Sequence, residues 1–467
     1  MNTNLFITGL REKLPIIAPV EQAADIAEVL PGASIDSRTE FAWWETWSEP
    51  VLAWGVTRLV CLFFLYAGWL YWPIPVDFRS QNPAAGPQQN LADYYRRWAA
   101  HPEEFAGSPM IGLELGGDDR WLAPLVRWDS FWYLSIAEVG YVHHPKPEAN
   151  NTSAGQDHNN RREQNLVFFP VYPLMILALG GADIPHALAA VLIANISTLL
   201  TSCLLYELVR RSYTASIARW TVWSWLLYPA SFFGMTAYSD STMALAVVGA
   251  LWYVQRERYA LAGLIAGVTS AMRPPGVLLG IALIDGWFHR RWLAATFGML
   301  LSGVGLAAYF WYLGRTFGDP FLYFKTIQEW GNIQTGLSRW DPLGWYFKAY
   351  HSLKYSLSLI AEKKPLLYYH SWRVVDPWMF AWVLFFLPTV RKFSWGQILF
   401  TLAMVLLLIT GASSLASIGR YCWVIMPVFV AAGWRLSESR IRWPMLAAMS
   451  FGLCWSAFLF GGNWEII

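Results

Sequence analysis

The chain has 467 residues, of which 55% are hydrophobic and only 14% are charged, and it carries 29 tryptophans. Soluble domains contain about a quarter charged residues, so the composition excludes an ordinary soluble protein and indicates a polytopic membrane protein. A net charge of +2 without a basic run gives no sign of nucleic-acid binding. The cysteines lie in apolar runs without paired spacing, which predicts small buried hydrophobic residues and not disulfides or metal ligands. They are Cys61, Cys203, Cys422 and Cys454.

Residues 1–49 are mixed in character and acidic, and they contain no basic stretch leading into a short apolar one. A cleaved signal peptide is therefore not expected. Trp43, Trp44 and Trp47 stand directly before the first apolar run, as in an interfacial aromatic belt. We interpret 1–49 as a cytoplasmic N-terminal segment and 50–467 as a single transmembrane domain.

Apolar segments recur through that domain. A helix needs about 20 mostly apolar residues to cross a bilayer, and about 11 segments come near that length. Pro274-Pro275 divides one long stretch into two helices, whereas Leu166–Leu179 is too short to cross and is expected to dip in and return. The predicted spans are 50–72, 187–209, 219–235, 237–255, 259–272, 275–288, 292–314, 376–390, 395–412, 420–436 and 443–461.

Basic residues indicate how these spans are oriented. They cluster in short loops that fall on alternate sides of the spans, all on one face, which the positive-inside rule makes cytoplasmic. Two large loops, 73–165 and 315–375, are then outside. Within them, aromatic and charged residues mix at helical spacing over 91–141 and 320–350, as in helices lying on the membrane. The polar, turn-rich stretch 142–163 is expected to be a mobile loop tip.

One carboxylate in the first outer loop, Asp129, stands among aromatic residues. On a helix that starts near it, Trp132, Tyr133 and Ile136 share its face. One interpretation is that Asp129 only caps an interfacial helix whose aromatics anchor it in the membrane. The other is that it serves as the base of an enzyme with a lipid-borne substrate. Asp118 and Asp119, earlier in the same loop, are expected to form a solvated turn.

Further polar groups stand at the outer ends of spans. A hairpin between two spans carries Tyr238 and Asp240 near its tip, Arg273 stands at the broken helix, and Arg420 begins a span. Charges near helix ends often snorkel or cap, but ionisable residues at membrane depth are also candidates for function. Arginine presents a planar fork suited to phosphate oxygens, and lipid phosphates lie at this depth. The aromatic residues of Asn165–Pro173 either pack or form a sugar platform.

Several common motifs are missing from the sequence. It contains no Walker loop, no dinucleotide-binding glycine fingerprint, no His-Glu-x-x-His and no Gly-x-Ser-x-Gly. The eight histidines show no metal-ligand spacing. The sequence therefore gives no sign of nucleotide-driven transport, zinc hydrolysis or serine hydrolysis, and neither a cofactor nor a metal is expected.

Five segments between about 120 and 425, in consistent order, resemble the motifs of one family: the PIG-V mannosyltransferases, which are the second mannosyltransferases of GPI-anchor synthesis, and their prokaryotic relatives. The first two segments are Trp128-Asp129-Ser130 with Tyr133, Ile136-Ala137 and Gly140-Tyr141, and Phe168–Pro173. The others are Pro229-Ala-Ser with Tyr238–Ser241, Arg273 with its neighbours, and Gly318–Phe321 with Gln328 and Trp330. Asp240 stands where the family usually has Glu, and Pro274-Pro275 replaces its Ser-Asn.

The resemblance implies a GT-C glycosyltransferase, a multi-span helical bundle whose active site lies on the outer face. Such enzymes take sugar from a polyprenyl phosphate, which for this family would be polyprenyl- or dolichyl-phosphate mannose. The lipid-linked sugar is a substrate, not a cofactor. By the same resemblance Asp129 is the catalytic residue of the first outer loop. We expect a multi-pass protein of the prokaryotic cytoplasmic membrane, or of the ER membrane in a eukaryote.

The predicted function is inverting transfer of a mannosyl, or another hexosyl, residue to a hydroxyl of a lipid or glycolipid acceptor. Asp129 would accept the hydroxyl proton, and Arg273 and Arg420 would bind the donor phosphate. The residues expected to bind substrate are Trp128, Tyr133, Tyr172, Tyr238, Asp240 and Tyr421. The alternatives are a lipid or sugar-lipid transporter and a scaffold subunit. The scaffold predicts that Asp129 and the two arginines lie apart.

Overall fold

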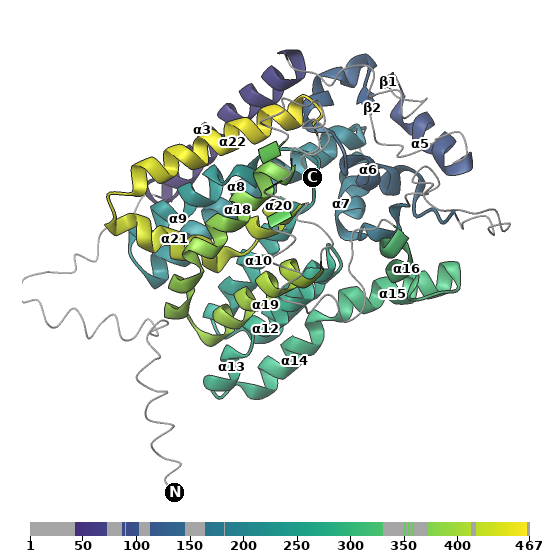
Figure 1. Ribbon diagram of the computed structural model, residues 1–467. Helices are drawn as coiled ribbons and strands as arrows, with labels where there is room; N and C mark the ends of the chain where they lie inside the picture. Colours follow the sequence, from purple (N-terminus) through teal and green to yellow (C-terminus); the bar gives the residue numbers. More distant parts are fainter. Residues whose placement is uncertain are drawn as a thin grey trace, which may run out of the picture.

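A computed structural model describes most of the predicted membrane domain. The described residues are 43–71, 86–88, 90–101, 113–144, 164–181, 183–329, 350–351, 354, 357–358, 372–411 and 417–464. Most of them are helical (Figure 1). Residues 1–42, most of the predicted loop tip at 142–163 and most of the predicted outer loop at 315–375 lie outside the described residues.

One half of the bundle is built from long helices packed side by side. Helix α3 lies along α22, and α8 lies between α9 and α10 (Figure 1). Close approach depends on small residues: Gly68 and Gly461 face the backbone of the partner helix between α3 and α22. The helices are α3 (Trp43–Tyr71), α8 (His186–Ser212), α9 (Ala215–Leu227), α10 (Asp240–Gln255), α21 (Met426–Glu438) and α22 (Arg442–Gly461).

The other half is more broken, with pieces of four to six residues between helices of ordinary length. Helix α11 packs on α14 through Gly263 and Gly298, whose Cα atoms meet the opposing backbone. The pieces are α11 (Tyr259–Ser270), η6 (Pro274–Leu278), α12 (Leu279–Ala282), α13 (Asp285–Phe288), α14 (Trp292–Ser302), α15 (Val304–Phe317), α18 (Trp372–Phe386), η9 (Leu387–Lys392), α19 (Trp395–Gly411) and α20 (Ile418–Trp423).

The remaining elements connect these helices along the chain, and several of them lie at one end of the bundle (Figure 1). The described residues are predominantly helical, as predicted, and they also include one short parallel pair, β1 and β2, in which Gly86 lies opposite Leu113. The elements are β1 (Gly86–Gln88), α5 (Leu91–Ala100), β2 (Leu113–Leu115), η2 (Gly117–Leu125), α6 (Ser130–Val139), η4 (Asn165–Val167), α7 (Val171–Gly180), η5 (Pro229–Gly234) and α16 (Leu322–Glu329).

Four helical segments among the described residues are long and apolar enough to cross a membrane: Trp47–Tyr71, His186–Ser212, Trp292–Phe317 and Arg442–Gly461. The other predicted spans are shorter or broken, so the predicted number of about 11 is not established. The predicted span 420–436 is in fact two helices, α20 and α21. The chain breaks at Val424–Ile425, and Pro427, near the start of α21, has no N–H to continue a helix from α20.

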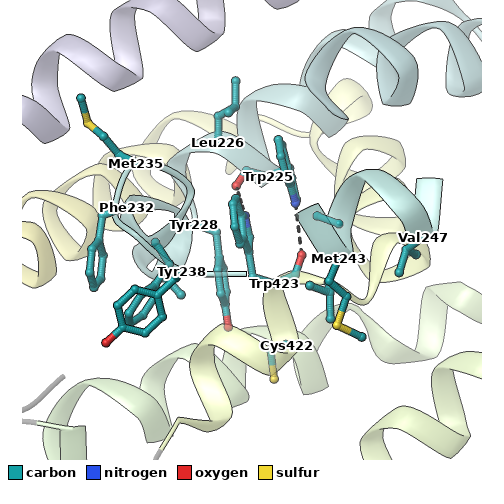
Figure 2. Packing of buried hydrophobic residues seen from close by; sticks show 14 of the residues in the cluster. Trp225, Leu226, Tyr228, Phe232, Met235, Tyr238, Met243, Val247, Cys422 and Trp423 are labelled. Atoms are coloured by element: carbon teal, nitrogen blue, oxygen red, sulfur yellow. Dashed lines mark hydrogen bonds between the residues drawn. The ribbon is translucent and has the colours of Figure 1, made fainter. Parts of the chain in front are cut away.

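Two tryptophans join the halves of the bundle behind this break. Trp225 of α9 and Trp423 of α20 stack with their ring centroids 4.7 Å apart, and each indole N–H donates to the other residue's carbonyl oxygen (Figure 2). Both are fully buried. Because a buried indole N–H needs an acceptor, this reciprocal pairing fixes the end of α20 against α9.

Candidate active site

Asp129 stands at the N-cap position of α6, as the capping interpretation predicts, but its side chain caps nothing. Its carboxylate instead forms an ion pair with Arg420, with Oδ2 2.6 Å from Nη2. The two residues come from the first large loop and from α20, and both are buried. The capping alternative is therefore wrong for the side chain, and the carboxylate is directed toward a cation.

The backbone around Asp129 is fixed from two sides. The Asp129 N–H donates to the Tyr238 hydroxyl at 3.1 Å, and that hydroxyl donates to the Arg127 carbonyl oxygen at 3.3 Å. Trp128 has φ of 51°, an uncommon conformation for a residue with a side chain, and its indole N–H donates to the Trp464 carbonyl oxygen at 3.0 Å. Such strain persists where surrounding contacts determine it. The strained turn therefore aims Asp129 toward Arg420.

A second ion pair lies beside the first. Arg273 Nη2 is 2.7 Å from Asp240 Oδ2, and both side chains are buried. Arg273 follows α11 in extended backbone, where Pro274 interrupts the helix, and Asp240 begins α10. The arginine also donates to Ser239 Oγ at 3.0 Å and to the Tyr133 hydroxyl at 3.2 Å. The loop motif, the hairpin motif and the broken helix therefore meet at one point.

The half-buried ring of Tyr421 connects the two pairs. The Arg273 guanidinium carbon is 5.1 Å from its centroid and the Arg420 carbon is 5.6 Å from it. Arg420 also lies 5.3 Å from the Tyr238 ring. Aromatic faces attract cations at these distances, so the rings hold two like charges side by side that would otherwise repel. The scaffold interpretation predicted separated charges, whereas the structure brings Asp129, Arg273 and Arg420 together.

Three guanidinium nitrogens in this cluster are buried without a hydrogen-bond partner among the described residues: Arg420 Nε, Arg420 Nη1 and Arg273 Nη1. Asp240 Oδ1, a buried acceptor, also has no hydrogen-bond partner among the described residues. Unpaired buried polar groups are costly and uncommon in folded proteins. The guanidinium groups can therefore bind the oxygen atoms of an anion, and Asp240 Oδ1 can accept a hydrogen bond from a ligand hydroxyl beside it.

The remaining predicted residues support the cluster in different ways. Burial raises the pKa of Tyr133, while nearby Arg273 opposes that shift, so the hydroxyl remains a hydrogen-bond donor at neutral pH. The Tyr172 ring packs edge-on against Tyr133 at 5.0 Å, and its hydroxyl donates to the Ala190 carbonyl oxygen. The polar atoms of Tyr172 and Trp128 are thus directed at the protein backbone.

Sequence reasoning missed two residues of this site. Ser239 lies between Arg273 and Tyr133, with its Oγ 2.8 Å from the Tyr133 hydroxyl. Asp376 accepts the backbone N–H groups of Ser417 and Gly419, just before Arg420. Asp376 stands beside a proline at the start of a predicted span, and an acid at that place was a signal that could have been followed. The described residues hold no group of three or more His, Cys, Asp or Glu that could bind a metal.

Comparisons with known proteins bear on the resemblance drawn from the motifs. No family model matches the chain. Over 168 residues the chain is 27% identical to GPI mannosyltransferase 2 from Yarrowia lipolytica, which confirms that it resembles the PIG-V type of mannosyltransferase. The matched stretch covers 36% of this chain and 42% of that protein, so the chain spans less than half of the relative's length.

Solved structures with a similar arrangement of helices include ArnT from Cupriavidus metallidurans, in its apo state and bound to undecaprenyl phosphate. Each has a TM-score of 0.41 and 15% identity to this chain. The match covers 84% of this chain and 62% of ArnT.

Proposed function

We propose that the protein is a GT-C-type membrane glycosyltransferase. It transfers a mannosyl residue, or another hexosyl residue, from a polyprenyl or dolichyl phosphate to a hydroxyl of a lipid or glycolipid acceptor. The active site is the cluster around Asp129, Arg273 and Arg420, on the extracytoplasmic face of the membrane. The sequence similarity to GPI mannosyltransferase 2 supports the sugar, and the chemistry of the cluster supports the phosphate.

The observation that carries this proposal is the set of buried guanidinium N–H groups near Tyr421 that have no partner among the described residues. A sugar phosphodiester presents oxygens that accept such N–H groups, and its negative charge grows as the phosphate leaves. Donors that are already oriented toward developing charge stabilise a transition state without reorganising, and loss of one typically costs about 10²–10³-fold in rate. Two arginines held in place by carboxylates and rings meet that requirement.

Of the two carboxylates, Asp129 is the better candidate for the base. Its side chain is 7% exposed, whereas that of Asp240 is 1% exposed, so Asp129 is the more accessible of the two to an incoming acceptor. Asp240 is more suited to hold Arg273 and to accept a sugar hydroxyl through its second oxygen. A base must lie within hydrogen-bond reach of the proton it removes, and a strained turn directs Asp129 to the phosphate-binding arginines.

In the proposed reaction the acceptor oxygen attacks the anomeric carbon from the face opposite the phosphate. The new C–O bond forms as the bond from the anomeric carbon to the phosphate oxygen breaks, which inverts the configuration. The phosphate departs with the bonding electron pair, next to Arg273 and Arg420. The acceptor proton passes to Asp129. Tyr133, Tyr238 and Tyr421 shape the site, and no step requires a metal or a cofactor.

A transporter of lipids or sugar-lipids is the second candidate, and one observation favours it. Both arginines lie at broken helices, after α11 and within α20, and transporters commonly build binding sites from discontinuous helices. A transporter would move the lipid-linked sugar across a membrane without cleaving it. An enzyme would release the polyprenyl phosphate.

Purified protein incubated with tritiated polyprenyl-phosphate mannose and membrane lipid extract tests the proposal. We expect label to move into a new lipid or glycolipid product. Asp129→Asn should lower that transfer by about 10²–10⁴-fold, the usual contribution of a positioned base. The matched control is Asp118→Asn, because Asp118 is an exposed carboxylate of the same loop at the start of η2, and it should transfer at the wild-type rate.

Full transfer by folded Asp129→Asn protein would overturn the assignment of the base. Movement of the intact labelled lipid between leaflets of reconstituted vesicles, without cleavage, would overturn the enzyme in favour of the transporter. Identification of the labelled product would also reveal the acceptor.

A further inference from the structure

Helix α20 has six residues, Ile418–Trp423, and it carries both Arg420 and Tyr421. A helix of this length is not stable by itself, because too few hydrogen bonds offset the cost of nucleating it. It therefore depends on contacts with its neighbours. Since a displacement of about 1 Å can cost about 10²-fold in rate, whatever holds α20 also determines how well Arg420 works.

The N-terminal end of α20 is held by Asp376 of α18. Asp376 Oδ1 accepts the N–H of Gly419 at 2.8 Å, and Oδ2 accepts the N–H of Ser417 at 3.1 Å. These donors belong to the first turn of a helix, whose N–H groups have no partner within the helix. Asp376 is buried, and Gly419 is packed so closely against Asp376 and Met379 that a side chain at Gly419 would overlap them.

The opposite end of α20 is held by the reciprocal Trp225–Trp423 pair (Figure 2). Helix α18 is itself tied to the start of the hairpin, because the Tyr228 hydroxyl donates to the Met379 carbonyl oxygen at 3.0 Å. That hairpin continues to Tyr238 and Asp240. The contacts around Asp376 therefore set α20 in register with the other side of the site.

We propose that Asp376 is a positioning residue for the glycosyl transfer reaction, which holds Arg420 in place to bind the donor phosphate and to face Asp129. This rests on the proposed function. Asp376 is not the base, because both of its carboxylate oxygens are engaged by backbone N–H groups. Its action on the reaction passes through α20, whose first N–H groups it holds.

The test compares Asp376→Asn with Asp285→Asn by transfer from tritiated polyprenyl-phosphate mannose, per mole of folded protein. Asp285 is a matched control, because it is also buried and its Oδ1 accepts the N–H of Gly396 at the start of α19, at 2.7 Å. An asparagine amide has one accepting oxygen and a donating NH₂ group, so Asp376→Asn loses one of the two hydrogen bonds. We expect Asp376→Asn to raise the donor KM about tenfold and to lower kcat, while Asp285→Asn changes the KM by less than about twofold.

A second measurement separates positioning from general destabilisation. When Asp376→Asn is added to Arg420→Lys, the donor KM should rise less than about twofold above that of Arg420→Lys alone. Both residues act on the same contact with the donor phosphate, so their effects do not add. If Asp376→Asn does not fold, Asp376→Glu serves in its place, because the longer side chain keeps both carboxyl oxygens but displaces α20. The same rise in KM is expected.

A wild-type donor KM in the folded Asp376 variant, or effects that multiply fully with Arg420→Lys, would overturn the inference and leave the proposed function standing. A wild-type protein that transfers no label from the donor would overturn both. A lower yield of folded protein, with a wild-type donor KM in the folded fraction, would show that Asp376 is purely structural.

Discussion

The two ends of α10 both carry charged clusters, but the clusters are built differently. Asp240 begins the helix and contributes to the site, whereas Gln255 ends it beside Arg256. With 16 residues and a rise of 1.5 Å each, the ends are about 24 Å apart. Near the far end, on the neighbouring helix α8, Glu207 pairs with Arg210 and Arg211, which lie three and four residues further along α8.

The difference lies in burial and in the separation of partners along the chain. The far-end arginines are 39% and 53% exposed, whereas Arg273 and Arg420 are each 7% exposed. Glu207 itself is buried, but its partners are local and reach solvent, and pairs of this kind contribute little and are expected wherever basic residues mark a membrane face. Buried pairs between distant segments carry a desolvation cost that their attraction does not always offset. A buried pair therefore suggests a chemical role rather than a stabilising one.

The largest contrast between the ends is expected in catalysis. Arg420→Ala removes a donor for the phosphate and leaves Asp129 without its cation, so transfer should fall about 10³-fold. Arg211→Ala at the far end should change transfer by less than about twofold, because Arg211 is half-exposed and touches no site residue. Rates of labelled mannose transfer by the two purified variants measure this. Equal losses would show that the two clusters do not differ in role.

A smaller contrast is expected in stability. Asp240→Ala leaves the Arg273 charge buried without a counter-ion, which should lower the free energy of unfolding by about 3 kcal/mol. Glu207→Ala should lower it by less than about 1 kcal/mol, because Arg210 and Arg211 can turn to solvent. Thermal unfolding of the two variants in the same detergent compares them. A larger shift for Glu207→Ala would contradict the distinction drawn from burial.

The sequence predicted which residues belong to the site better than how they pair. Charge at span ends and the order of the motifs placed Asp129, Asp240, Arg273 and Arg420 together, and the structure has them in one cluster. The pairing of Asp129 with Arg420 depends on the break between α20 and α21. A helix running straight through 420–436 would have placed the arginine differently, and only Pro427 signals the break.

The fold was predictable in its helical character but not in the number of spans. Hydropathy shows where apolar helices occur, yet helices interrupted by Pro274 or ending at η5 are shorter than a bilayer requires. The parallel pair of β1 and β2 has three residues in each strand and no alternating pattern, so nothing in the sequence indicated it. Asp376 stood at the start of a predicted span, but its partners are backbone N–H groups, so no residue signature linked it to Arg420.

The smallest contrast compares one hydrogen-bonding side-chain hydroxyl near each end of α10. Tyr133→Phe removes the hydroxyl that contacts Ser239 and Arg273, and Ser212→Ala removes the acceptor of the Gln255 amide. Each loses a hydrogen bond that is at least partly buried, so each should lower the free energy of unfolding by about 1 kcal/mol. Only Tyr133→Phe should also slow transfer, by about tenfold, because it loosens an arginine that binds the donor. Unfolding and transfer measured on the same preparations separate the two effects, and an equal loss of transfer from Ser212→Ala would show that activity merely follows stability.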